Sequence, residues 1–330
     1  MDFLKDYKNK IFFENIKNFN ELALELFKFQ AETNKIYKRY IQYLCLNPAD
    51  IKRIEDIPFL PVQFFKEHKI LCEGVDYQTI FESSGTSNLN PSKHFISDVE
   101  IYKKSLHKSF ELFFGNINDY IILALLPSYL ESKNSSLIFM VKELIKASND
   151  NRSGFYLYNY KDLYSLINSL SKGKKKIFLL GVSFALLEFA QKYNVDMHNS
   201  VVMETGGMKG RGKELPREEL HKILCKSFNK KEIQSEYGMT ELLSQSYSMG
   251  KGIFKSPPWK KILIRNIYDP FEMLEANKSG GINVIDLANI ASCAFIETSD
   301  IGVLQENNTF KVLGRIDNSD IRGCNLMLEM

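Results

Sequence analysis

Three short apolar runs, each followed by residues with helical spacing, constrain the fold of this chain most strongly. Residues 120–126, 176–180 and 200–204 have the length and composition of buried strands. Because strands that alternate with amphipathic helices usually pair in parallel, the pattern predicts an α/β fold with a mostly parallel sheet. The helices that we expect behind these strands span residues 137–145, 184–193 and 216–228.

The flanking parts of the chain follow other patterns. Residues 16–45 have apolar side chains at helical spacing and predict an amino-terminal helical segment, with Asn20 as its N-cap. Two prolines make residues 57–62 extended, and residues 96–114 predict a helix. Four later runs predict strands joined by turns, in an antiparallel or barrel-like subdomain. These runs are residues 259–268, 281–287, 293–298 and 309–313.

Composition excludes several classes of function. The 330 residues are 44% hydrophobic and carry a net charge of +3, so no strong positive field argues for nucleic acid. No apolar run approaches the roughly 20 residues of a membrane-spanning helix, and the amino terminus has no signal-peptide core, so we expect a cytoplasmic protein. The five cysteines are scattered without a Cys-x-x-Cys pair, which indicates neither a disulfide framework nor a zinc site.

A polar loop at residues 81–94 is the first candidate binding element. It gathers hydroxyl and glycine residues, followed by Lys93 and His94. Small side chains let backbone N–H groups approach an anion and a lysine adds charge, so this composition suits a phosphate. The spacing is not that of a Walker loop, and taken alone the loop is most simply a polar surface turn. His94, beside the loop, is a candidate contact for a substrate.

Three further parts of the sequence carry related chemistry. Residues 204–207 place a glycine pair at the carboxyl end of a predicted parallel strand, where open α/β sheets bind ligands. Residues 236–241 combine an aromatic ring, a glycine, a hydroxyl and a carboxylate, which can stack a base, hydrogen-bond a phosphate and bind Mg²⁺. Residues 298–302 and 314–320 add an aspartate and an arginine that could hold ribose hydroxyls.

In this order, the four stretches resemble the motifs of the adenylate-forming superfamily, which includes acyl-CoA synthetases and peptide-synthetase adenylation domains. More narrowly, four segments look like the acyl-protein synthetase of the bacterial luminescence fatty-acid reductase complex, the LuxE family. The resemblance covers roughly residue 57 to the end of the sequence. The segments that carry it are residues 126–131, 206–214, 237–245 and 320–327.

The resemblance implies a fold and a division of the chain. The fold would be the large amino-terminal domain of adenylate-forming enzymes, with parallel α/β sheets and a small barrel-like antiparallel subdomain. Residues 1–50 would be a helical segment packed on the main domain, residues 51–316 the adenylate-forming domain, and residues 317–330 a short tail.

The resemblance also implies ATP and Mg²⁺ as cofactors and assigns residues to them. Tyr237 would stack on the adenine, Thr240 would contact the α-phosphate, and Glu241 would help to hold Mg²⁺. Asp300 and Arg315 would grip the ribose. The remaining ATP-binding candidates are Ser83, Ser84, Gly85, Thr86, Ser87, Gly206, Gly207 and Gly238.

The catalytic cation is the main departure from the wider superfamily. Most members carry a mobile carboxy-terminal domain whose lysine bridges the carboxylate and the α-phosphate. We expect this chain to lack that lysine, since the sequence stops at residue 330. Candidate replacements are Lys209, Arg211 and Lys213 after the glycine pair, and Lys93 after the polar loop; each could instead be a solvated loop charge.

Cys324 is the candidate acyl acceptor. By resemblance it takes the acyl group from the adenylate as a thioester, and a thiolate beside Arg322 is a suitable nucleophile. The family implies a carboxylic acid substrate, expected to be a fatty acid, and a partner protein related to acyl-CoA reductases.

Three other functions stay open at the level of sequence. Residues 207–214 are one residue short of a Walker A loop, which suggests a P-loop kinase, although Glu214 stands where a hydroxyl must bind Mg²⁺. A CoA ligase of the phenylacetate type would transfer the acyl group to free CoA instead of Cys324. A degenerate adenylation fold could serve as a non-catalytic scaffold for a reductase subunit.

Overall fold

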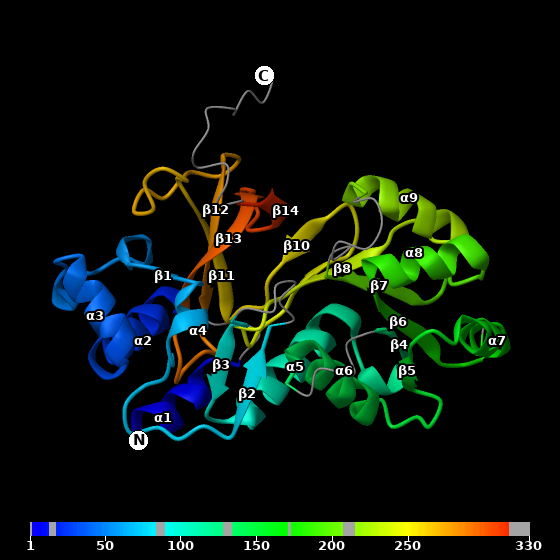
Figure 1. Ribbon diagram of the computed structural model, residues 1–330, viewed down its shortest axis with the longest axis horizontal. Helices are drawn as coiled ribbons and strands as arrows, with labels where there is room; N and C mark the ends of the chain where they lie inside the picture. The colour runs from blue at the N-terminus through cyan, green and yellow to red at the C-terminus, as the bar shows by residue number, and fades with distance from the viewer. Residues whose placement is uncertain are drawn as a thin grey trace.

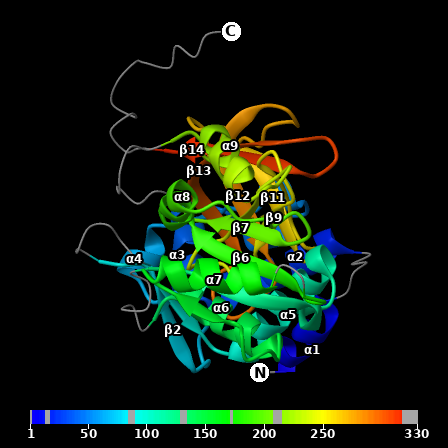
Figure 2. The same cartoon turned by 90° about the vertical axis from the view of Figure 1, so that its right-hand side faces the viewer.

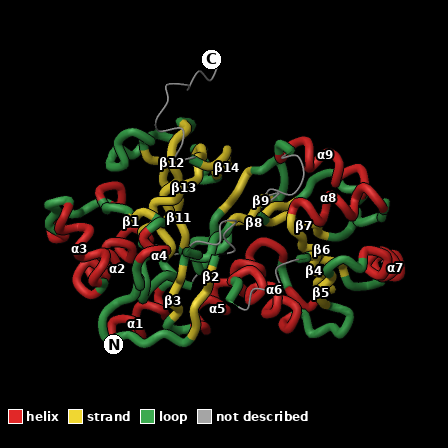
Figure 3. Tube along the Cα trace, viewed as in Figure 1, coloured by secondary structure: helices red, strands yellow, loops and turns green. Residues whose placement is uncertain are grey.

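The computed structural model describes residues 2–12, 18–83, 90–127, 134–170, 173–206 and 215–316. Within these residues, twelve strands form one mixed sheet and two more form a separate hairpin (Figures 1 and 3). The helices are α1 (Asp2–Lys10), α2 (Phe19–Thr33), α3 (Lys35–Tyr43), α4 (Phe64–Glu67), α5 (Val99–Phe114), α6 (Ser136–Ala147), α7 (Tyr160–Leu170), α8 (Ser183–Lys192) and α9 (Arg217–Ser227). The strands are β1 (Leu60–Pro61), β2 (Thr79–Glu82), β3 (Lys93–Ile96), β4 (Tyr120–Leu125), β5 (Gly154–Tyr156), β6 (Lys176–Val182), β7 (Val201–Thr205), β8 (Gln234–Tyr237), β9 (Ser246–Ser248), β10 (Ile253–Lys255), β11 (Lys260–Arg265), β12 (Ser279–Asp286), β13 (Phe295–Leu304) and β14 (Phe310–Arg315). None of the described helices is long and apolar enough to cross a membrane.

One half of the large sheet is parallel and runs in the order β5, β4, β6, β7 and β8. All six residues of β4 are buried, as are the residues of β6 that follow Lys176. These strands are continuously apolar because helices cover both faces. Figures 1 and 2 show α8 and α9 on one side and α5 and α6 on the other. The predicted parallel α/β pattern is confirmed, whereas the sequence pattern does not predict α7 or β5.

The other half of the sheet is antiparallel, as predicted for the later strands. It continues from β8 through β9, β10 and β14 to β13, β12 and β11. Asp300 on β13 and Arg315 on β14 are direct cross-strand partners, and the register shifts between Ile301 and Gly302. A Cβ atom at Gly302 would lie 2.6 Å from the carbonyl oxygen of Lys311, so glycine is needed for the strands to approach here. The glycine of the motif at residues 298–302 therefore fixes the sheet that carries Asp300.

The polar loop joins the two strands of a β-hairpin that the sequence pattern does not predict. Strands β2 and β3 pair antiparallel, with Glu82 opposite Lys93. The next helix, α5, begins at Val99 and not at residue 96, because Asp98 occupies its N-cap. The Oδ1 atom of Asp98 accepts a hydrogen bond from the backbone N–H of Glu100 at 3.0 Å.

Buried amides hold the amino-terminal helices to the antiparallel half. The Nε2 atom of Gln30 donates a hydrogen bond to the carbonyl oxygen of Asn289 at 2.8 Å. Asn34, which separates α2 from α3, donates to a carbonyl oxygen of the same loop at 2.8 Å. Helices α2 and α3 fall within residues 16–45, where the sequence pattern predicts helix. The predicted N-cap of this segment is wrong, since Asn20 lies inside α2 and Asn18 precedes the helix.

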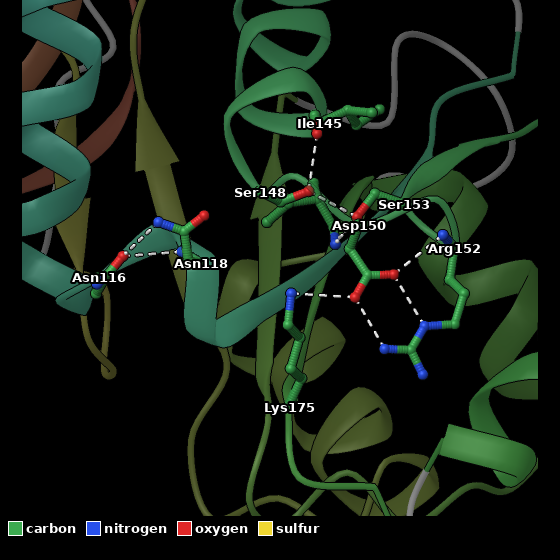
Figure 4. A network of polar contacts seen from close by, with 9 residues as sticks. Asn116, Asn118, Ile145, Ser148, Asp150, Arg152, Ser153 and Lys175 are labelled. Carbon is green, nitrogen blue, oxygen red and sulfur yellow. Dashed lines mark hydrogen bonds and ion pairs between the residues drawn. The ribbon is translucent and has the colours of Figure 1, made fainter.

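A polar network lies at the amino-terminal ends of the parallel strands (Figure 4). Asp150 accepts hydrogen bonds from Nε and one terminal guanidinium nitrogen of Arg152, both at 2.8 Å, and Lys175 Nζ lies 3.1 Å away. These contacts, those of Arg152 first, hold the pKa of Asp150 well below its ordinary value. Ser153 accepts a 3.0 Å hydrogen bond from the backbone N–H of Ile122 on β4. The network stabilises the end of the parallel strands that lies opposite the candidate site.

Candidate active site

The predicted binding stretches lie close together where strand pairing in the large sheet changes from parallel to antiparallel. Strand β8 pairs parallel with β7 on one side and antiparallel with β9 on the other. Two stretches, residues 204–207 and 236–241, include the carboxyl ends of β7 and β8. Ligands of open α/β sheets bind outside the carboxyl ends of the strands, so this location agrees with the prediction.

Tyr237, the last residue of β8, joins two of the stretches. Its hydroxyl donates a 2.8 Å hydrogen bond to Oδ2 of Asp300, and Oδ1 of Asp300 lies 3.5 Å from Nε of Arg315. Burial, followed by the charge of Asp300, raises the pKa of Tyr237 well above its ordinary value. The side chain of Arg315 is 74% exposed, so the ion pair stabilises the fold little and leaves the guanidinium open to a ligand. The three residues predicted to hold adenine and ribose therefore form one contiguous group.

Aromatic and cationic side chains fix the ring of Tyr237. The rings of Phe254 and Phe310 lie 5.9 and 5.6 Å from it, between centroids. Lys260 Nζ lies 5.3 Å from the centroid of Tyr237 and donates a 2.9 Å hydrogen bond to the carbonyl oxygen of Ser244. Burial lowers the pKa of Lys260 to about 8. Sequence reasoning missed Lys260, because one lysine at the start of a strand carries no signal that it is buried.

The two ends of the polar loop are held together at Ser83 and Ser92. The backbone N–H of Ser83 donates to the carbonyl oxygen of Ser92 at 3.1 Å, and the backbone N–H of Ser92 donates to Oγ of Ser83 at 2.9 Å. Burial raises the pKa of Glu241, and a hydrogen bond from the side chain of Ser92 partly offsets that effect. Ser83, assigned to the phosphates, is thus linked through Ser92 to Glu241, assigned to Mg²⁺.

The position of His94 corrects the expectation that it contacts a substrate. The residue is 1% exposed, and both ring nitrogens have protein partners. Its Nδ1 lies 2.9 Å from the carbonyl oxygen of Thr240 and its Nε2 lies 2.8 Å from Oγ of Ser292. Because a carbonyl only accepts, Nδ1–H is the donor and Nε2 accepts from Ser292. His94 therefore holds the backbone of Thr240 and is a positioning residue.

This burial predicts an acid-sensitive fold. Burial lowers the pKa of His94 from 6.5 to about 4, so the unfolded chain binds more protons than the folded chain between these pH values. We expect the contribution of His94 to the free energy of unfolding to be complete above pH 6.5 and to fall by roughly 3 kcal/mol as the pH drops to 4. Urea unfolding of the wild type and of His94→Asn across pH 4–7 measures it. The variant should show the shallower pH dependence, and equal slopes would contradict the assignment.

Thr205 connects the glycine-pair stretch to β8. Its Oγ1 donates a 2.5 Å hydrogen bond to Oε2 of Glu236, whose pKa is raised by burial. A Cβ atom at Gly238 would lie 2.3 Å from Oε1 of Glu236, so the glycine of the predicted motif leaves room for this carboxylate. On the other side of Thr205, the carbonyl oxygen of Gly206 accepts a 2.8 Å hydrogen bond from Ser183.

Of the predicted catalytic cations, Lys93 belongs to the described part of the chain. Lys93 is exposed at the start of β3, beside the end of the polar loop. The roles of a further set of predicted site residues stay predictions, because these residues lie outside the described part of the chain. They are Ser84, Gly85, Thr86, Ser87, Gly207, Lys209, Arg211, Lys213, Arg322 and Cys324.

The side chains present suit a magnesium-bound nucleotide. Mg²⁺ is usually held by one or two carboxylates together with substrate phosphates, and Glu241 beside the ends of the polar loop offers one such carboxylate. Asp300 accepts one hydrogen bond on Oδ2 and keeps free lone pairs for the hydroxyls of a sugar. The described residues include no cluster of three or more His, Cys, Asp or Glu side chains that could hold a metal by themselves.

Comparison with known families and proteins gives consistent matches. The family model described as acyl-protein synthetase, LuxE, matches residues 6–330. A long-chain-fatty-acid–luciferin-component ligase of Vibrio harveyi is 20% identical over 335 residues, which cover 94% of this chain and 86% of the relative. The ligase of the same name from Aliivibrio fischeri is 24% identical over 344 residues, covering 94% of this chain and 87% of the relative.

Solved structures match at the level of the fold. ATP-bound MatB from Rhodopseudomonas palustris has a TM-score of 0.56 and 15% identity, covering 74% of this chain and 49% of MatB. An open conformation of 2-hydroxyisobutyryl-CoA ligase has a TM-score of 0.64 and 10% identity, covering 91% of this chain and 70% of the ligase. The chain thus spans about half the length of MatB, and the predicted adenylate-forming fold is confirmed.

Proposed function

This chain belongs to the LuxE family of acyl-protein synthetases and has the adenylate-forming fold, and from that premise we propose that it activates a fatty acid with ATP and transfers the acyl group to Cys324. The observation that carries the proposal is that Asp300 contacts both Tyr237 and Arg315. The link from Glu241 through Ser92 to Ser83 supports it. These contacts support the proposal because they lie in one part of the fold and involve residues that we assign to the adenine, the ribose, the phosphates and Mg²⁺.

The acid-activating step needs positioning more than it needs a base. A carboxylate oxygen of the acid attacks the α-phosphorus of ATP, a new carbonyl–oxygen–phosphorus linkage forms, and the bond from the α-phosphorus to the bridging oxygen breaks. The electron pair leaves with pyrophosphate. No proton is moved, because the acid is already ionised at pH 7. The protein must therefore hold the two reactants in line and stabilise the negative charge on the phosphates.

One group of residues would bind the nucleoside of ATP, and another would bind its phosphates. Tyr237 would stack on the adenine while Asp300 and Arg315 bind the ribose, and the backbone of Gly206 would line the base. Thr240, whose carbonyl oxygen is bound by His94, would present its hydroxyl to the α-phosphate. Mg²⁺, held in part by Glu241, would neutralise phosphate charge. The polar loop that begins at Ser83 would bind the phosphates, in the family manner.

The second step transfers the acyl group to sulfur. The thiolate of Cys324 attacks the acyl carbon, the carbon–oxygen bond to AMP breaks, and AMP leaves with the electron pair. The thiol proton goes to solvent when the thiolate forms. An acyl reductase related to those that use acyl-CoA would receive the acyl group, as the family relationship suggests.

Isotope exchange between ATP and pyrophosphate tests the first step. With ATP, Mg²⁺ and a panel of fatty acids of different lengths, label from pyrophosphate should enter ATP only when a suitable acid is present. Cys324 is not needed for this exchange, so the assay separates acid activation from acyl transfer. Exchange that is absent with every acid, or that does not depend on acid, would contradict the proposed function.

Glu241→Gln is expected to lower the exchange rate at least tenfold, which corresponds to about 1.4 kcal/mol, because the amide binds Mg²⁺ more weakly than the carboxylate. Raising the Mg²⁺ concentration should restore part of the rate in the variant, which separates loss of metal affinity from a folding defect. Glu275→Gln, in an exposed turn, is the matched control and should exchange like the wild type. A Mg²⁺ dependence in Glu241→Gln identical to that of the wild type would rule out the metal role.

A further inference from the structure

A basic cavity lies between α4 and the outer face of β3, next to the end of the polar loop. Its volume is about 230 Å³. Three lysines and a histidine line it, namely Lys66, Lys69, Lys93 and His68, together with Phe65 and Phe95. The helix and the strand come from separate parts of the sequence but lie side by side in Figures 1 and 3. Of these cations, sequence reasoning considered Lys93 and missed Lys66 on α4 and Lys69 just after it.

The positive charge in this cavity is only partly offset by the protein, since Glu67 lines the cavity and Glu82 lies opposite Lys93 in the hairpin. Glu67 is the one carboxylate that lines it, and among the described residues no ion pair involves Lys66, Lys69 or Lys93. Lys69 Nζ instead lies 4.7 Å from the ring centroid of Tyr77 and 5.5 Å from that of Phe95. Like charges gathered in one cavity repel each other, and a bound anion would offset that repulsion.

A charge in the cavity acts on a residue of the candidate active site. Burial raises the pKa of Glu241, and the positive charges of Arg315 and Lys66 act against burial by favouring the ionised carboxylate. Lys93 directly follows Ser92, which closes the polar loop and hydrogen-bonds Glu241. The ends of the loop therefore stand between the cavity and Glu241.

The size of the cavity limits the choice of anion. Pockets for drug-sized ligands measure roughly 300–1,000 Å³, so 230 Å³ is too small for a whole nucleotide but suits a small polyanion. The lysine side chains are exposed, as expected where a product leaves for solvent. We propose that this cavity binds inorganic pyrophosphate, the leaving group of the acid-activating step, through Lys66, Lys69 and Lys93. The inference rests on the proposed function.

Calorimetric titration of inorganic pyrophosphate into the full chain, with Mg²⁺ and without ATP or acid, tests this site. The double variant Lys66→Gln with Lys69→Gln should bind pyrophosphate about tenfold more weakly than the wild type, which corresponds to about 1.4 kcal/mol. The matched control is Lys35→Gln with Lys38→Gln, which removes the same charge at the same spacing from exposed positions on α3. It should bind like the wild type, and thermal melts should show that both variants are folded.

Several outcomes would overturn the proposal. They are an absence of pyrophosphate binding by the wild type, equal affinity in the wild type and the Lys66/Lys69 variant, or an equal loss in the Lys35/Lys38 control. Binding of adenosine 3′,5′-bisphosphate, the phosphate-bearing part of CoA, in place of pyrophosphate would also contradict it. The titration needs no turnover, so the pyrophosphate site can be confirmed even if no acid supports exchange, and exchange can proceed even if this site fails.

Discussion

Replacing Asp300 by asparagine is expected to weaken ATP binding by about 10- to 100-fold, which corresponds to about 1.4–2.8 kcal/mol. The carboxylate accepts a 2.8 Å hydrogen bond from the hydroxyl of Tyr237 and lies 3.5 Å from Nε of Arg315. An amide at this position would lose the charge that attracts Arg315 and would offer one fewer acceptor oxygen to the ribose. Calorimetric titration of ATP into the wild type and the variant measures the effect.

Two comparisons make the Asp300→Asn result specific. Asp269→Asn removes a carboxylate from an exposed turn, where Oδ1 accepts a 3.0 Å hydrogen bond from the backbone N–H of Phe271, and it should bind ATP like the wild type. Tyr237→Phe keeps the ring and removes the hydroxyl, so its effect on ATP affinity should be smaller than that of Asp300→Asn. Wild-type ATP affinity in Asp300→Asn would show that this cluster is not the nucleoside site.

Cys324→Ser is expected to abolish the attachment of acyl groups to the protein while leaving acid activation intact. A serine hydroxyl is hardly ionised at pH 7 and is a much weaker nucleophile than a thiolate toward the acyl adenylate. With a labelled fatty acid, ATP and Mg²⁺, the wild type should carry label that neutral hydroxylamine removes, and the variant should carry none. The rate of ATP–pyrophosphate exchange should agree within about twofold between the two proteins, since the activating step does not use the thiol.

Cys45→Ser is the control for this experiment, because Cys45 is an exposed free cysteine that the proposed reaction does not use. Its labelling should equal that of the wild type. Label that persists in Cys324→Ser would remove the thioester step at Cys324, and label lost equally in Cys45→Ser would point to a different acceptor.

The parallel half of the fold could be predicted because its pattern is local. The continuously apolar segments of β4 and β6 and the helices behind them follow from burial on both faces. The glycines at positions 238 and 302 could be located by their motifs. The physical reason for Gly302, the close approach of the Lys311 carbonyl oxygen, depends on the pairing of two strands, whereas Gly238 leaves room for the carboxylate of Glu236, two residues before it.

What the sequence could not give depends on long-range packing. The hairpin of β2 and β3 has no two-residue turn signal, because a long polar loop separates the strands. His94 looked like a substrate contact because it is close in sequence to the loop. Pairing with β2 turns its side chain inward, where Thr240 and Ser292 occupy both ring nitrogens. The burial of Lys260 beside Tyr237 likewise follows from the position of β11 in the folded sheet.

Analysis of products from a single incubation tests acid activation most directly. The protein is mixed with ATP, Mg²⁺, neutral hydroxylamine and a panel of labelled carboxylic acids, without CoA, and AMP, ADP and acyl hydroxamate are quantified. Activation of the acid as its adenylate predicts AMP and hydroxamate in equal amounts, no ADP, and a preference for one class of acid. Formation of ADP in place of AMP, as a kinase would give, or of AMP only after CoA is added, would contradict it.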